Sequence, residues 1–109
     1  MQLNELRAVG NLTQDPEIRT VGKGVSIANL SLAINRTTKI KEEIKKEVVF
    51  IKVSIWGKKA DECSKLHKGS AILVFGRLKQ SEWTDKKTGE VKRAIEIHAD
   101  NIIPIERED

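Results

Sequence analysis

Apolar and polar residues alternate along most of the chain, and this period of two predicts β-strands. The first strand is expected over residues 3–12, with Gly10 as a bend or bulge. Residues 13–16 have the composition of a turn, because aspartate favours local turns and proline fixes the backbone angle φ. Residues 22–24 contain two glycines and mark a second turn.

A second strand is expected over residues 28–35, where alternation gives the strand one apolar and one polar face. A bulge or bend near Ile27 would explain why Val25 and Ile27 fall on the opposite phase. Residues 37–47 carry seven charges, and we expect a protruding, mobile loop there. Ile40 and Ile44 lie at helical spacing, which leaves a short helix as the alternative.

The third strand, residues 48–56, has two different faces. The aliphatic face is expected in the core and consists of Val49, Ile51, Val53 and Ile55. The opposite face carries two aromatic rings, Phe50 and Trp56, with Lys52 between them. A helix is then expected over residues 58–68, ending at Gly69 as C-cap. Its narrow apolar stripe consists of Ala60, Cys63 and Leu66.

Two further strands are expected after this helix. The core face of the fourth strand consists of Ile72, Val74, Gly76 and Leu78. Lys79 and Trp83 lie on its other face, and residues 84–89 form a hairpin tip. The fifth strand covers residues 91–99, with Ile95 and Ile97 pointing inward, and Pro104 stops any continuation.

Three strands, one helix and two strands is the order of an OB-fold, in which strands 2 and 3 and the flanking loops form the usual binding face. The sequence therefore predicts an all-β protein, a five-stranded OB-fold barrel with one short helix between strands 3 and 4. A length of 109 residues fits one domain. We expect residues 1–105 to form it, and residues 106–109 to be a short polar end.

Composition excludes several classes of protein. An apolar content of 39% is too high for a disordered chain. No run approaches the roughly 20 apolar residues of a membrane span, and no signal peptide is expected at the N-terminus. Cys63 is the only cysteine, which excludes an intrachain disulfide and favours a reducing compartment such as the cytoplasm. A net charge of +4 fits either a polyanionic partner or an ordinary basic surface.

Catalysis finds little support in the sequence. His67 and His98 are far apart and have no partner at metal-ligand spacing. Cys63 lies on the apolar stripe of the helix, where a buried and inert thiol is expected. We therefore expect no enzyme, no metal site and no cofactor.

The aromatic residues are few, two Phe, two Trp and no Tyr, so their positions are informative. Bases stack on exposed rings while Lys and Arg follow the phosphates, which is how proteins bind single strands. Two strand faces combine rings with lysines in this way: Phe50, Lys52 and Trp56 on one, Lys79 and Trp83 on the other. Packing in a second core or a subunit contact is the alternative. Trp83 favours stacking because it precedes a polar tip, whereas Phe75, beside Leu73, is expected in an oligomer contact.

Several segments resemble the bacterial single-stranded DNA-binding proteins. Residues 10–19 are similar to the N-terminal signature of that family, residues 27–36 to its second strand, and residues 56–61 to its strand-to-helix junction; residues 68–70, 76–78 and 83–85 follow in the family's order. The resemblance covers nearly the whole chain. It implies an OB-fold, usually a homotetramer, that binds single-stranded DNA without sequence preference and protects it during replication, recombination and repair, in the cytoplasm and associated with the nucleoid.

The resemblance also implies which residues bind DNA. Phe50 and Trp56 match base-stacking positions on the third strand, and Trp83 matches one on the hairpin between strands 4 and 5. Basic positions near the DNA path are matched by Arg19, Lys52, Lys58, Lys68, Lys79 and Lys92.

The chain also departs from this family. Thr38 stands where many members carry a stacking tryptophan, Arg93 stands where a tyrosine is common, and Ser81 and Glu82 occupy a stretch that is often basic. The chain ends at Asp109 without the family's acidic, Phe-ended tail, which leaves the recruitment of replication and repair proteins open. An alternative is an OB-fold interaction protein resembling the primosomal replication proteins, which acts mainly through protein partners.

Overall fold

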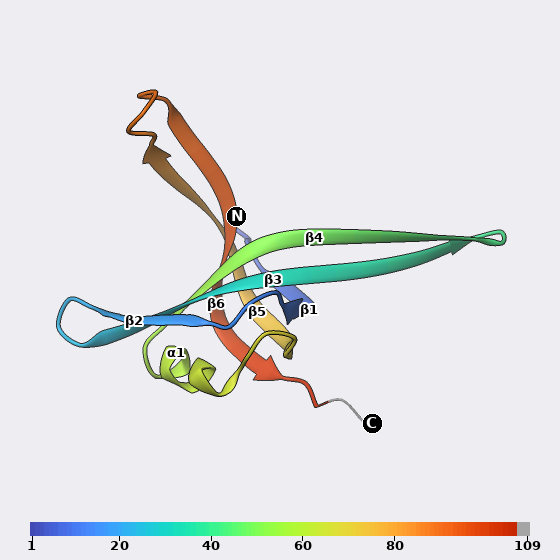
Figure 1. Cartoon of the computed structure of the whole chain (residues 1–109), viewed down its shortest axis with the longest axis horizontal. Helices are drawn as coiled ribbons and strands as arrows, with labels where there is room; N and C mark the ends of the chain where they lie inside the picture. The colour runs from blue at the N-terminus through green and yellow to red at the C-terminus, as the bar shows by residue number, and fades with distance from the viewer. Residues whose placement is uncertain (107–109) are drawn as a thin grey trace.

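The computed structural model describes residues 1–106 and shows a coiled β-barrel from which two long hairpins project (Figure 1). Its elements are β1 (Leu6–Leu12), β2 (Glu17–Val21), β3 (Val25–Ile40), β4 (Glu43–Trp56), α1 (Lys58–Glu62), a 3₁₀ turn (Cys63–Lys65), β5 (Ala71–Thr84) and β6 (Val91–Pro104). The strands pair in the order β1-β5-β6-β4-β3-β2, and a further pairing of β1 with β3 closes the barrel. The predicted five-stranded OB-fold with a short helix is therefore confirmed. Of the polar end expected at residues 106–109, only Glu106 lies among the described residues.

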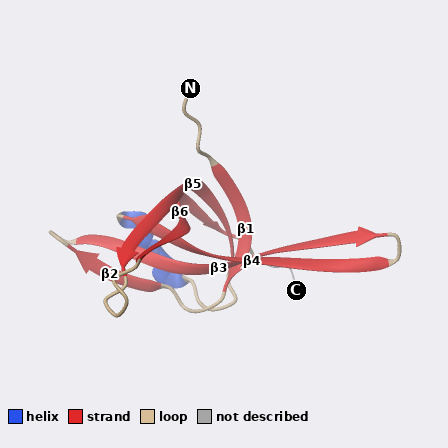
Figure 2. Ribbon diagram, turned by 90° about the horizontal axis from the view of Figure 1, so that it is seen from above, coloured by secondary structure: helices blue, strands red, loops and turns tan. Residues whose placement is uncertain are grey.

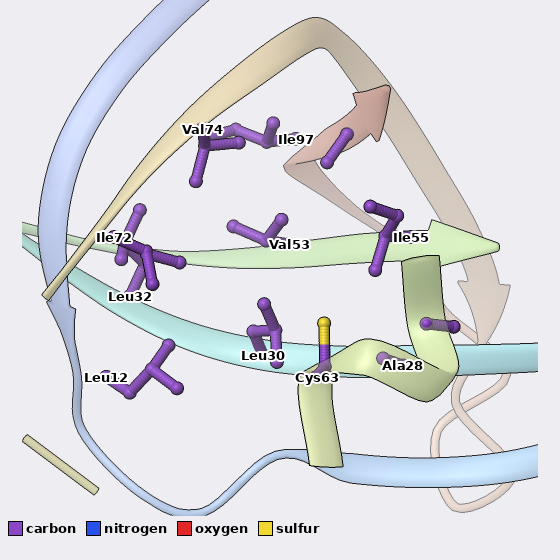
Figure 3. Packing of buried hydrophobic residues seen from close by; sticks show 12 residues of the cluster. Leu12, Ala28, Leu30, Leu32, Val53, Ile55, Cys63, Ile72, Val74 and Ile97 are labelled. Atoms are coloured by element: carbon purple, nitrogen blue, oxygen red, sulfur yellow. The ribbon is translucent and has the colours of Figure 1, made fainter. Parts of the chain in front are cut away.

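The core is the aliphatic interior of the barrel (Figure 3). Its largest fully buried side chains are Leu30, Leu32, Ile55, Ile72, Ile97, Val53 and Val74. None of the four aromatic rings belongs to the buried core formed by residues 1–106, as the sequence indicates. The barrel is held by tightly packed branched aliphatic side chains, and the rings stay available at the surface.

The barrel closes where β1 crosses β3, and Gly10 makes this crossing possible. A Cβ atom at Gly10 would lie 2.6 Å from the carbonyl oxygen of Ala33. The pairing of β1 with β5 runs without a shift through this position, so there is no bulge at Gly10. The glycine is needed here because two backbones approach closely.

Two local predictions need correction around the helix and the edge of the sheet. The expected turns at residues 13–16 and 22–24 flank β2, a short edge strand that pairs only with β3. This strand was not expected, because its mostly exposed residues show no alternation.

The helical segment ends earlier than expected. α1 ends at Glu62, and the 3₁₀ turn that follows it ends at Lys65, because Leu66 adopts extended backbone angles. Its apolar stripe is confirmed, since Ala60 and Cys63 are buried. Gly69 lies in the following loop with φ 93° and is not the C-cap.

Residues 35–48 form a regular hairpin, here called the β3–β4 arm, which protrudes as predicted but is neither an irregular loop nor a short helix (Figure 2). Pairing runs without interruption from Ile27 opposite Trp56 to Ile40 opposite Glu43, so the bulge expected near Ile27 is also absent. Lys41 turns the chain with φ 58°. The prediction failed because both faces of the arm meet solvent, so alternation of apolar and polar residues, the main sequence signal for a strand, is lost.

A second hairpin, here called the β5–β6 arm, consists of residues 79–96 and leaves the barrel in another direction (Figure 1). Three residues expected in the core lie where strands pass from barrel to arm: Val49, Leu78 and Ile95. Their side chains are 54%, 44% and 53% exposed. Their phase along the strand is that of core residues, but the barrel no longer covers the strand at these positions.

Candidate nucleic-acid interface

The outer face of β3 and β4 collects the predicted residues of the third strand. Residues directly opposite one another in a sheet share a face. Phe50 pairs with Ala33, Lys52 with Ser31, and Trp56 with Ile27. Small or apolar partners lie beside the rings, and both remain accessible, since Phe50 is 71% and Trp56 44% exposed.

The edge strand β2 adds Arg19 to the same face. Arg19 pairs with Ile27, which pairs on its other side with Trp56. Arg19, Ile27 and Trp56 therefore form one row across three strands. A guanidinium and an indole flank an isoleucine in this row, an arrangement that offers a phosphate-binding group next to a stacking surface.

A groove of about 480 Å³ lies between β4 and the β5–β6 arm, here called the ring groove. Its lining includes Phe50 and Lys52 from β4, Ser81 and Trp83 from β5, and Glu96 from β6. Trp83 is 48% exposed. Two rings from separate strands thus share one open groove with a lysine.

A second groove of about 460 Å³, here called the Arg19 groove, is lined by Arg19, Asn29 and Ser31 among others. Lys52 and Glu96 line both grooves. The two grooves therefore join into a continuous path from β2 across β3 and β4 to the β5–β6 arm. Strands distant in sequence supply its rings and cations.

The β5–β6 arm places Lys79 and Lys92 on the same face as Trp83. Trp83 pairs directly with Lys92, and Lys79 pairs with Glu96. The Lys92 Nζ lies 3.3 Å from an Asp85 carboxylate oxygen. The pKa of Asp85 is lowered first by the backbone N–H of Lys87, which donates to it at 2.8 Å, and then by Lys92. Asp85 holds the tip in shape and partly compensates the charge of Lys92.

Two predicted cations lie apart from this path. Lys68 is in the loop before β5, where its backbone N–H donates to the Asp15 carboxylate at 2.8 Å. It lines a different groove, with Leu66 and Ile105. Lys58 begins α1, after the end of β4, so it lines neither groove and has no strand partner that joins it to the path, in contrast to Trp56, Lys79 and Lys92. The geometry thus brings together seven of the nine predicted residues: Arg19, Phe50, Lys52, Trp56, Lys79, Trp83 and Lys92.

The β3–β4 arm supplies cations that the sequence analysis did not select. Lys46 pairs with Thr37 and Lys39 with Ile44, in the same phase as Phe50 and its partner. Two of the arm's three glutamates, Glu43 and Glu47, lie on the opposite phase, and Glu42 lies in the turn at the tip. Among the paired residues of the arm, the face continuous with Phe50 therefore carries lysines and no acid. Counting back in steps of two from Phe50 would have found Lys46, had this segment been predicted as a strand.

Within residues 1–106, no group of three or more His, Cys, Asp or Glu side chains is placed to hold a metal ion. Burial, and secondarily the charge of Glu62, raises the pKa of the Cys63 thiol to about 11. The thiol is therefore protonated at neutral pH and a poor nucleophile. No helix in the described part of the chain is long and apolar enough to cross a membrane.

Comparison with known proteins gives a consistent result. A model of the single-strand binding protein family matches residues 3–105. Single-stranded DNA-binding protein 1 of Staphylococcus aureus is 40% identical over 102 residues, covering 92% of this chain and 64% of that protein. The single-stranded DNA-binding protein of Deinococcus radiodurans is 31% identical over 106 residues, covering 96% of this chain and 35% of that protein. The chain thus spans from about a third to about two thirds of the length of these relatives.

A solved structure is similar over almost the whole chain. The crystal structure of a deletion mutant of the single-stranded DNA binding protein from Thermus aquaticus superposes with a TM-score of 0.81 at 29% sequence identity. The similarity covers 95% of this chain and 51% of that chain. The barrel with its arms is therefore an arrangement that is also found in this relative.

Proposed function

The chain belongs to the single-strand binding protein family, and on this premise we propose that it binds single-stranded DNA by base stacking and phosphate contacts, without catalysing a reaction. The observation that carries the proposal is the continuous path formed by the ring groove and the Arg19 groove. The alternative of an OB-fold protein that acts mainly through protein partners is not favoured, because the relatives are single-stranded DNA-binding proteins.

Binding follows from the chemistry of the two grooves. Bases stack on Phe50 and Trp83 in the ring groove, and on Trp56 in the row that it forms with Ile27 and Arg19. Each stack contributes roughly 1–3 kcal/mol whatever the base. The cations alongside neutralise phosphates and release counterions, which makes the affinity depend on salt. Aromatic rings supply the stacking surface and cations the electrostatic attraction, so a strand of any sequence can be bound. Such a protein would protect exposed strands in replication, recombination and repair, in the cytoplasm near the nucleoid.

We further propose that the chain acts as a homo-oligomer, with the tetramer implied by resemblance. An apolar row crosses the outer face of β1, β5 and β6, where Val9 pairs with Leu73 and Leu73 with Ile103. Val9 is 53% and Ile103 43% exposed. Phe75 lies on the same face, two residues along β5. A second copy of the chain would cover this row and remove its apolar surface from water.

Titration with oligo-dT tests the binding. Intrinsic tryptophan fluorescence should be quenched strongly at low salt and less as salt rises. Trp56→Ala and Trp83→Ala, measured by anisotropy of a labelled oligo-dT, should each weaken binding by about 5- to 150-fold. Ile105→Ala, which changes an apolar residue outside both grooves, should bind normally. Absence of quenching at micromolar protein in low salt would overturn the proposal.

A further inference from the structure

An acidic side chain lies at the centre of the proposed DNA path. Glu96 is half-buried on β6 and lines both the ring groove and the Arg19 groove. It pairs with Lys79 across the sheet and shares both grooves with Lys52. A surface that served only to attract phosphates would place no carboxylate here, because like charges repel.

Glu96 accepts a hydrogen bond from β5. The hydroxyl of Ser81 donates to Glu96 Oε1 at 3.1 Å and also lies 3.4 Å from the carbonyl oxygen of Ala94. Within residues 1–106, ion pairs join Lys92 to Asp85 and Arg93 to Glu82, and none involves Glu96. The carboxylate thus has acceptor capacity left on Oε2. It faces the same groove as Phe50 and Trp83, where bases are proposed to stack.

We infer that Glu96 gives this surface a base preference, favouring bases with an exocyclic amino group over thymine; the inference rests on the proposed binding of single-stranded DNA. Phosphates are repelled from Glu96, so the groups that approach it are base edges. Cytosine N4 and adenine N6 carry amino donors that a carboxylate accepts, whereas thymine presents a carbonyl oxygen at the corresponding position. Stacking alone tolerates every base, so Glu96 adds a discrimination that the rings do not supply.

Oligo-dC and oligo-dT of equal length separate this effect from stacking, because both are pyrimidines. In the wild-type protein and in Glu96→Gln, the dissociation constants of both oligomers are measured by anisotropy at one salt concentration. Glutamine has the same shape but offers a donor as well as an acceptor. The ratio of dC affinity to dT affinity should fall about tenfold in Glu96→Gln, the size expected of one charge-assisted contact to a base.

A control variant accounts for the change in net charge. Glu62→Gln removes the same charge from α1, outside both grooves, and should leave the dC to dT ratio unchanged. If Glu96→Gln strengthens binding to both oligomers equally, Glu96 acts by repulsion alone and the inference is wrong. If the wild-type protein binds neither oligomer, it is the proposed function that fails. Thermal unfolding of each variant verifies that it is folded.

Discussion

At the scale of single residues, Gly76 lies on β5 where this strand passes from the barrel to the β5–β6 arm. A β-bulge lies between Phe75 and Gly76, where the partner register moves from Asn101 to Ala99. The backbone of β6 lies so close here that a Cβ on Gly76 would overlap the carbonyl oxygen of His98. Because the obstacle is backbone and not a flexible side chain, neither strand can give way without disturbing the bulge that directs the arm.

We therefore predict that Gly76→Ala lowers the free energy of unfolding by about 1–3 kcal/mol, as overpacking does in other tight sites. Urea unfolding followed by tryptophan fluorescence measures this. Gly22→Asn is a suitable control, since Gly22 has φ 56° with nothing near its Cβ position, and asparagine tolerates this backbone conformation. A Gly76→Ala protein as stable as the wild type would show that β6 can move away from this position.

At the scale of elements, the two faces of the β3–β4 arm differ in charge. Lys39 and Lys46 lie on the face continuous with Phe50, whereas Arg36 and Lys45 lie on the other face with the glutamates. Cations beside the rings can follow the phosphates of a strand that leaves the ring groove. Those on the far face cannot reach the same strand, and Arg36 directly opposes Glu47.

The double variant Lys39→Ala, Lys46→Ala should therefore bind oligo-dT more weakly, and the slope of log K against log salt should become shallower by about 1.4, since each phosphate contact to a single strand contributes about 0.7. Arg36→Ala, Lys45→Ala removes the same number of charges from the other face and should leave the slope unchanged. Equal effects of the two variants would mean that the arm acts through its total charge and has no binding face.

These elements also show what the sequence could and could not reveal. The ring positions on β4 were predictable, because Phe50 and Trp56 share the phase opposite to the aliphatic residues of the core face. The arm was not, because a hairpin exposed on both faces has no periodic pattern for a core to impose. Glu96 was not selected either. A single glutamate in a strand has no sequence signal, and only the pairing of β6 with β5 and β4 brings it beside Lys79 and Lys52.

At the scale of the whole molecule, the net charge of +4 is small for the proposed binding of a polyanion. The path formed by the two grooves gathers only a few cations from each copy. For about five neutralised phosphates per copy, the slope of log K against log salt would be near −3.5. A homo-oligomer would present several such paths to one strand, and the slope would steepen in proportion to the copies that a strand contacts.

Leu73→Glu tests this arrangement, because it places a charge in the middle of the apolar row formed by Val9, Leu73 and Ile103. Light scattering should give the wild-type protein a mass of four times the 12.3 kDa protomer, and the variant a smaller multiple. With a long oligo-dT, the slope of log K against log salt should become shallower in the variant and approach about −3.5, the value expected for a single copy. Arg7→Glu places the same side chain beside the row, at a position that is already charged, and should disturb assembly less even though it changes the net charge by −2 instead of −1. If Leu73→Glu keeps both the mass and the slope of the wild type, the apolar row is not the contact between copies.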